Sequence, residues 1–147
     1  MDEQKIRILR ETGHYLSVPK GVSMYPMLKS RENVVDVVEL QGKLKKYDVA
    51  LYYRKEDNKC VLHRVIAVKD THYVFFGDNC WQREMVPHGD VMGVAARFFR
   101  KGKWVDVDDR RYMAYVRFWY FILPLRRPVY WLRDKAKQLY GRIRGKR

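Results

Sequence analysis

Cysteine is scarce in this sequence of 147 residues, which contains only Cys60 and Cys80. Two thiols are too few for a disulfide framework, and they lack the paired Cys-x-x-Cys spacing of a structural metal site. Their small number leaves the redox compartment open, with a slight preference for a reducing one.

Long hydrophobic runs are also missing. The segment from Met1 to Gly13 alternates charged residues with isolated apolar ones, so it predicts no secretory signal peptide. The most apolar run, Tyr112 to Leu125, contains Arg117 and Pro124 and is shorter than the ~20 apolar residues that a spanning helix needs. We therefore expect neither a transmembrane helix nor an N-terminal membrane anchor.

Acidic residues are almost absent from the C-terminal quarter. From Arg110 to Arg147 the chain has twelve Lys and Arg against one acid, Asp134, which accounts for +11 of the net charge of +14. The rest of the chain carries only +3, and a chain of this length is the size of one domain. The sequence therefore predicts a folded domain over residues 1–109 and a basic, aromatic helical tail over residues 110–147.

Short apolar and β-branched segments, separated by turn residues, fill the predicted domain after a helix at Glu3–Thr12 that Gly13 ends. Closely spaced strands of this kind favour a mainly β, antiparallel domain over alternating βα units. The expected strands are Tyr15–Val18, Val34–Leu40, Val49–Arg54, Cys60–Val68, His72–Phe76, Val91–Arg100 and a piece near Trp104–Val107.

The tail has the periodicity of an amphipathic helix. Its apolar residues recur at spacings of three and four and form one stripe, while basic residues fall elsewhere. We expect Pro124 and Pro128 to separate this helix from the aromatic segment before it. The stripe consists of Val129, Leu132, Ala136, Leu139 and Ile143.

Three short segments contain residues that suit nucleophilic catalysis: Gly21–Leu28 with Ser23, Val61–Ile66 with His63, and the Gly-Asp-Asn turn within Phe76–Asn79. A serine hydroxyl is a weak nucleophile until an adjacent base takes its proton, and imidazole suits that task. Taken singly, each segment has a structural explanation: a loop serine, a packed strand histidine and an ordinary turn.

In their order and spacing these segments resemble the signal peptidase I family, over roughly Val18 to Val105. Histidine followed by Arg-Val resembles the archaeal and endoplasmic-reticulum branch, in which histidine replaces the lysine base. The resemblance implies the fold of signal peptidases and LexA-type peptidases, with Ser23 as nucleophile and His63 as base. The carboxylate that orients the base is left open between Asp78 and Glu84.

The sequence departs from that family at three places. Gly21 stands where a serine often assists the oxyanion hole, Arg31-Glu32-Asn33 replaces a Gly-Asp pair, and the N-terminal membrane anchor is missing. Loss of one oxyanion donor typically costs ~10²-fold in rate.

The resemblance implies a serine endopeptidase that cleaves a signal or leader peptide after small residues through an acyl-enzyme, without a cofactor. A metal site built from Cys60, His63, Cys80 and His88 is not expected, since an odd separation places Cys60 and His63 on opposite faces of a strand. The alternative function is a catalytically silent module that uses the basic tail to dock on a membrane or a nucleic acid.

The aromatic and basic residues of the tail fit the interface of a membrane with an anionic leaflet. We expect peripheral attachment on the cytoplasmic side. Two interpretations compete: the stripe packs on the protein's own body, or the basic surface binds nucleic acid nonspecifically through phosphates. Nucleic acid is not the expected partner, and nothing in the tail reads a base sequence. The expected contact residues are Trp119, Tyr120, Arg126, Arg127 and Trp131.

Overall fold

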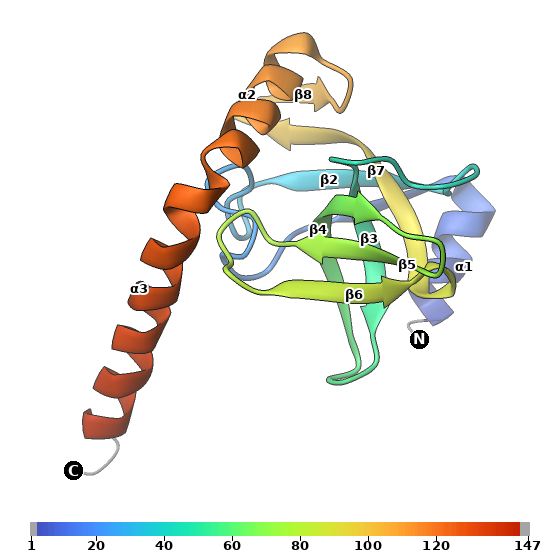
Figure 1. Cartoon of the computed structure of the whole chain (residues 1–147). Coiled ribbons are helices and arrows are strands. Elements are labelled where there is room, and N and C mark those ends of the chain that lie inside the picture. Colours follow the sequence, from blue (N-terminus) through green and yellow to red (C-terminus); the bar gives the residue numbers. More distant parts are fainter. Residues whose placement is uncertain (1–2, 145–147) are drawn as a thin grey trace.

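Eight antiparallel strands form one strongly bent sheet in the computed structural model, which describes residues 3–144 (Figure 1). This confirms the predicted mainly β class. The elements are α1 (Glu3–Thr12), β1 (His14–Ser17), β2 (Val34–Val38), β3 (Val49–Arg54), β4 (Lys59–Val68), β5 (His72–Phe76), β6 (Arg83–Pro87), the 3₁₀ turn η1 (His88–Asp90), β7 (Val91–Arg100), β8 (Lys103–Asp106), α2 (Arg110–Phe121) and α3 (Leu123–Arg144).

The strand β6 is the one strand, among the residues that the structure describes, that the sequence pattern did not predict. Among its five residues only Val86 is buried, and Pro87 ends it. A strand with this pattern lies at the edge of a sheet, where proline is tolerated and one face meets solvent. The missed strand matters for function because it contains Glu84, which faces Phe75 of β5 in the register.

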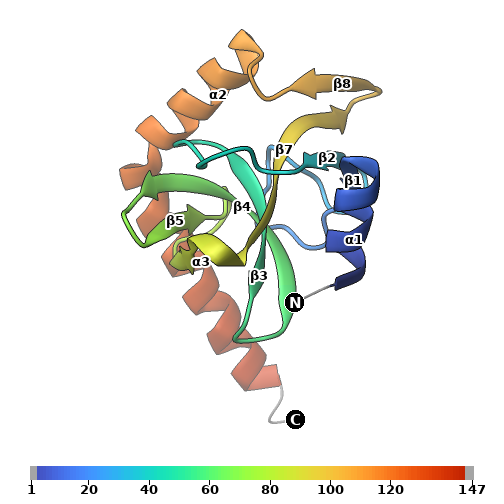
Figure 2. The same cartoon turned by 90° about the vertical axis from the view of Figure 1, so that its right-hand side faces the viewer.

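The sheet has the order β1-β2-β7-β3-β4-β5-β6, and β8 pairs with the distal half of β7. Bending of this sheet encloses two hydrophobic clusters on its concave surfaces. One cluster joins β2, β3 and β7 to the loop after β1 and to α2, and the other lies under β3, β4 and β5. Figure 2 shows α1 beside β1 and β2, on the side of the molecule opposite α3.

The helix α2 belongs to the folded body. Tyr112 and Val116 are buried in the first cluster, and the Asp109 carboxylate caps the helix by accepting from the Tyr112 amide at 2.9 Å. An N-terminal cap of this type contributes about 1 kcal/mol. The boundary predicted after Asp109 therefore divides residues that share one core, because a basic composition did not distinguish a packed helix from a free tail.

The helices α2 and α3 meet at Ile122, two residues before Pro124, the first of the two prolines that were expected to separate them. Pro124 lies in the first turn of α3, where its missing N–H costs nothing, and Pro128 is inside the same helix. The expectation that Pro128 separates two helices is wrong, since α3 continues through it. No helix within residues 3–144 combines the length and the apolar character that crossing a bilayer requires.

Candidate active site

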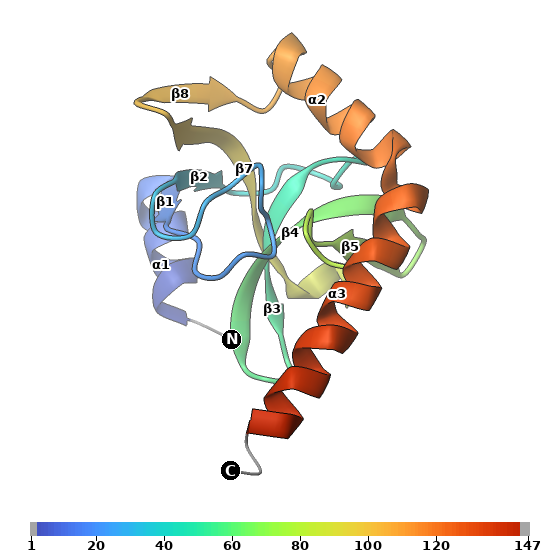
Figure 3. The same ribbon diagram turned by 90° about the vertical axis from the view of Figure 1, so that its left-hand side faces the viewer.

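The loop of residues 18–33 connects β1 to β2 (Figure 3). Ser23, in this loop, lines a cleft. After Ser23 the chain makes a turn in which the Leu28 amide donates to the Met24 carbonyl at 2.8 Å. Met24, Met27 and Leu28 are all buried in the core, whereas Ser23 is only partly buried. Apolar anchors on its C-terminal side thus fix the backbone that presents the serine.

Gly77 lies close to both the Ser23 backbone and the imidazole ring of His63. A Cβ atom built on Gly77 would lie 2.9 Å from the Ser23 carbonyl oxygen and 3.1 Å from His63 Nε2, so these two atoms are no further apart than the sum of those distances. Among the residues that the structure describes, Ser23 Oγ and Nε2 form no hydrogen bond. Catalytic hydrogen bonds are often long without substrate and tighten when it binds.

The second nitrogen of His63 faces a tyrosine and a carboxylate. Tyr52 pairs with Val61 in the β3–β4 register, so its side chain is a diagonal neighbour of His63 on the same face. The Tyr52 hydroxyl lies 3.1 Å from Nδ1 and donates to Glu84 Oε2 at 2.6 Å, while Glu84 Oε1 lies 3.4 Å from Nδ1. Because the phenol proton goes to Glu84, the phenol oxygen is free to accept from Nδ1–H, and Nε2 keeps its lone pair.

Glu84 is held in its charged form. Burial alone would raise the pKa of its carboxyl, but hydrogen bonds from His63 and Tyr52, together with the charges of His63 and Arg54, outweigh burial and lower this pKa to about 2. Arg54 Nη1 contacts Glu84 Oε1 at 3.2 Å. A carboxylate whose pKa is lowered to about 2 therefore stands beside the His63 ring.

Asp78 is turned away from His63. Its carboxylate is fully buried and accepts from Arg64 Nε at 3.0 Å and Nη2 at 2.9 Å, and from the Tyr120 hydroxyl at 2.7 Å. Coulombic attraction to Asp78 outweighs the burial of Arg64 and raises the pKa of that guanidinium. Of the two carboxylates that the sequence left open, Glu84 lies beside His63 and Asp78 pairs with Arg64, so Asp78 does not contact the ring that it was expected to orient.

The turn at Gly77–Cys80 connects this ion pair to the loop that contains Ser23. Asn79 donates from its amide N–H to the Ser23 carbonyl at 2.7 Å and from its side chain to the Val22 carbonyl at 3.0 Å. The Gly-Asp-Asn segment therefore acts as a scaffold: Asp78 anchors it in the core, and Asn79 docks on the loop that presents Ser23.

Side chains of α2 and α3 hold the same turn from the other side. Trp119 Nε1 and Arg126 Nη1 donate to the Asp78 carbonyl, at 3.2 and 3.1 Å, and Arg133 Nη1 donates to Asn79 Oδ1 at 2.7 Å. Arg126 also lies over the Trp119 ring, with its Cζ 3.6 Å from the ring centroid. The two helices thus help to position the candidate active site.

These contacts correct part of the predicted membrane contact set. Trp119, Tyr120 and Arg126 face the body, because the buried Asp78 turn supplies acceptors that a sequence pattern does not reveal. Arg127 is exposed yet donates to the Trp81 carbonyl at 3.0 Å, and Trp131 is 42% exposed.

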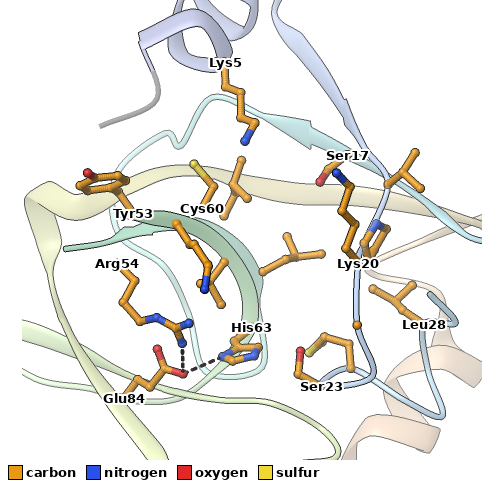
Figure 4. Close-up of a pocket in the computed structure, with 18 of the residues that line it drawn as sticks. Lys5, Ser17, Lys20, Ser23, Leu28, Tyr53, Arg54, Cys60, His63 and Glu84 are labelled. Atoms are coloured by element: carbon orange, nitrogen blue, oxygen red, sulfur yellow. Dashed lines mark hydrogen bonds and ion pairs between the residues drawn. The ribbon is translucent and has the colours of Figure 1, made fainter. Parts of the chain in front are cut away.

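The cleft beside these residues has a volume of about 1020 Å³. The loop before Ser23 forms one wall and the β3–β4 hairpin another, with the Lys5 side chain of α1 reaching in from above (Figure 4). Ser23, His63 and Glu84 all line it. Enzyme clefts of this size accommodate ligands of several hundred Å³, so an extended peptide of a few residues fits.

The four residues considered as metal ligands do not form one group in the part of the chain that the structure describes. Cys60 and His63 both border the cleft, because residues from both faces of the β3–β4 hairpin line it, contrary to the alternation expected of a flat strand. His88 instead packs against Tyr73, with the two ring centroids 4.3 Å apart. Within residues 3–144 no three His, Cys, Asp or Glu side chains form a group suited to a metal ion. Burial raises the pKa of the Cys80 thiol to about 11, which keeps it protonated.

Gly21 adopts a φ of +92°, a value that residues with a side chain rarely adopt, and its amide donates to Ser30 Oγ at 3.0 Å. The backbone conformation of the loop therefore explains the glycine at a position where the family resemblance predicts a serine. Tyr52 and Arg64 were not predicted as site residues, although Arg64 directly follows His63 in the sequence.

A comparison with protein-family models, curated proteins and solved structures found no match to this chain.

Proposed function

We propose that this protein is a serine endopeptidase of the signal peptidase type, in which Ser23, His63 and Glu84 act together. The observation that supports this most is the polar chain on Nδ1 of His63: the Tyr52 hydroxyl at 3.1 Å and the Glu84 carboxylate at 3.4 Å orient the ring with Nε2 toward the Ser23 segment. A nucleophile, a base and a group that orients the base form the general pattern of covalent catalysis by serine.

In the proposed mechanism Ser23 Oγ attacks the carbonyl carbon of the scissile peptide bond while Nε2 of His63 takes the hydroxyl proton. Ionised Glu84 stabilises the resulting imidazolium through Nδ1–H, directly and through the Tyr52 hydroxyl. Nε2 then gives the proton to the leaving amine, which leaves an acyl-enzyme on Ser23. Water deprotonated by the same nitrogen hydrolyses this ester and restores the serine.

Cleavage of a mixed peptide library tests the proposal. The wild-type protein should generate new N-termini, and the Ser23→Ala and His63→Ala variants should not. Ser17→Ala is a matched control, since Ser17 lines the same cleft from β1 but has no place in the mechanism. Absence of new termini with the folded wild-type protein would contradict the peptidase function and favour the docking module. Sites with small residues before the cut would support the specificity that the family resemblance implies.

We further propose that the protein attaches peripherally to an anionic membrane, on the cytoplasmic side, through the outer face of α2 and α3. Large apolar side chains recur on this face at helical spacing: Phe118, Phe121, Leu125, Val129, Leu132 and Leu139, each at least 59% exposed. The stripe that the sequence predicted also includes Ile143, whose side chain is outside the part of the chain that the structure describes. Basic residues flank the face, which suits a helix lying in the interfacial plane of an anionic leaflet.

Co-sedimentation with vesicles of about one-third phosphatidylserine tests this attachment. The double variant Phe121→Asp/Leu125→Asp places two charges on the apolar face and should lose vesicle binding. Met85→Asp introduces the same charge at an apolar side chain that is 75% exposed on β6, outside that face, and should bind as wild type does. Equal binding of all three proteins would rule out the proposed face.

A further inference from the structure

Arg133 of α3 binds the turn beside the nucleophile with both terminal nitrogens of its guanidinium group. Its Nη1 donates to Asn79 Oδ1 at 2.7 Å, and its Nη2 donates to the Asn79 carbonyl at 3.1 Å. The Asp134 carboxylate accepts from Nε at 2.9 Å, and the guanidinium carbon lies 4.7 Å from the centroid of the Tyr130 ring. These contacts fix the direction of the guanidinium, whose planar fork loses little freedom for each bond that it makes.

Asn79 extends this constraint to the backbone around Ser23. Its side-chain amide donates to the Val22 carbonyl at 3.0 Å, and its backbone N–H donates to the Ser23 carbonyl at 2.7 Å. A guanidinium only donates and a carbonyl only accepts, so Arg133 and Val22 together select one orientation of the Asn79 amide group. Among the described residues, the bond to Val22 is the one that would still hold this amide if Arg133 were removed.

The peptide unit between Val22 and Ser23 sets the direction of a further donor. This unit is planar and trans, so the Ser23 N–H points away from the Val22 carbonyl and from Asn79. Within residues 3–144 the Ser23 N–H has no hydrogen-bond acceptor. A free backbone N–H at the nucleophile can stabilise the oxyanion of acyl transfer. Because Gly21 offers no hydroxyl for that task, the direction of the Ser23 N–H matters more.

We infer that Arg133 is a positioning residue for acylation, which acts through Asn79 and fixes the direction in which the Ser23 N–H meets the oxyanion. This inference rests on the proposed peptidase function and extends its site to α3. Arg133 does not line the cleft, so it acts on the orientation of the donor and not by contact with the substrate.

Stopped-flow acylation of Ser23 by an activated ester measures the effect. Complete loss of an oxyanion donor costs ~10²-fold or more in rate, so a donor that is only misaligned in Arg133→Ala should slow acylation about tenfold. The half-saturating ester concentration should stay unchanged, because the N–H is needed in the transition state. Guanidinium ion, added well below denaturing concentrations, should restore part of the rate, whereas sodium chloride at the same concentration should not. Lys137→Ala removes an exposed cation further along α3 and should react as the wild type does.

A double-mutant cycle tests the path through Asn79. Asn79→Ala alone should slow acylation at least as much as Arg133→Ala, and the double variant should be no slower than Asn79→Ala, since both changes break one chain of contacts. Additive losses would overturn the inference, as would a normal rate in Arg133→Ala or an equal loss in Lys137→Ala. A loss that guanidinium does not restore and that accompanies a lower melting temperature would also overturn it, because Arg133 would then have a purely structural role.

Hydrogen exchange provides a readout that needs no turnover. The amides of residues 22–28 should exchange several-fold faster in Arg133→Ala than in the wild-type protein, because this loop loses the support of a fixed Asn79, and they should not do so in Lys137→Ala. Unchanged exchange in Arg133→Ala would overturn the inference, whatever the activity of the wild type. Faster exchange in that variant, with a wild-type protein that is never acylated, would refute the peptidase and leave Arg133 as a residue that orders the loop.

Discussion

Replacement of Tyr52 by phenylalanine separates the orienting role of its hydroxyl from the packing of its ring. The ring is fully buried and lies 4.4 Å from Phe75, a contact that phenylalanine keeps. The hydroxyl donates to an ionised Glu84 at 2.6 Å and contacts His63 Nδ1 at 3.1 Å. A hydrogen bond to a charged group contributes about 1.5–3 kcal/mol.

The expected effect on catalysis follows from that range. If the bond is needed in the transition state, its loss slows acylation of Ser23 by about 10- to 100-fold, since each 1.36 kcal/mol is tenfold in rate. The variant should also unfold about 5–9 °C lower, at roughly 3 °C for each kcal/mol in a chain of this size. Stopped-flow acylation by an activated ester and thermal unfolding measure the two effects.

The loss of stability should depend on pH through Glu84. Its pKa in the folded protein is about 2, below the ordinary value of 4.5, so the charged carboxylate stabilises the fold above pH ~4.5 and this contribution disappears as the pH falls toward 2. Tyr52 strengthens this effect by hydrogen bonding to the charged form. The difference in unfolding free energy between wild type and Tyr52→Phe should therefore be largest above pH ~4.5 and should shrink below it.

The neighbouring tyrosine, Tyr53, provides the matched control. It follows Tyr52 on β3, and its hydroxyl donates to Asn58 at an exposed position, so Tyr53→Phe should change neither acylation nor the pH dependence of stability. If Tyr52→Phe and Tyr53→Phe acylate at the same rate, the proposed orienting chain is refuted.

Three further substitutions test other parts of the site. Glu84→Gln removes the anion that stabilises the imidazolium and should move the acid limb of the pH profile of kcat/KM to lower pH; an unmoved limb would exclude Glu84 as its partner. Asp78→Asn leaves a buried guanidinium without its counter-charge and should cost about 3–5 kcal/mol in urea unfolding, whereas Asp57→Asn, in an exposed pair, should cost much less; equal costs would contradict the scaffold role. Gly77→Ala introduces a Cβ only 2.9 Å from the Ser23 carbonyl and should reduce acylation at least tenfold, whereas Gly89→Ala, with open space around it, should not; full activity of Gly77→Ala would show that the turn is free to move.

The local pattern of apolar, β-branched and turn residues was sufficient to predict most strands of the sheet. The bounds of β3, β5 and β7 agree with the sequence prediction, because each consists of apolar or β-branched residues between turn residues. The strand β6 was missed because an edge strand buries few side chains and its composition is that of a loop. Its absence from the prediction left no basis for placing Glu84 beside the base.

The choice between Asp78 and Glu84 depended on contacts between residues far apart in the sequence. Glu84 reaches Tyr52 across 32 positions, and Asp78 reaches Tyr120 across 42. Neither contact can be predicted from local propensity, because the strands β3, β4, β5 and β6 must first pair before these residues come close together. The same reason explains why the helices after Asp109 were predicted as a separate tail, although Arg64 of β4 binds Tyr112 at 2.7 Å.

The proposed mechanism requires that Ser23 becomes acylated with His63 as its base. Incubation with a small activated ester, acid quenching and peptide mapping by mass spectrometry test it most directly. We predict one acyl group per chain, located on Ser23, absent from Ser23→Ala and strongly reduced in His63→Ala. A folded protein that gains no adduct, or that carries it on another residue, would contradict the account.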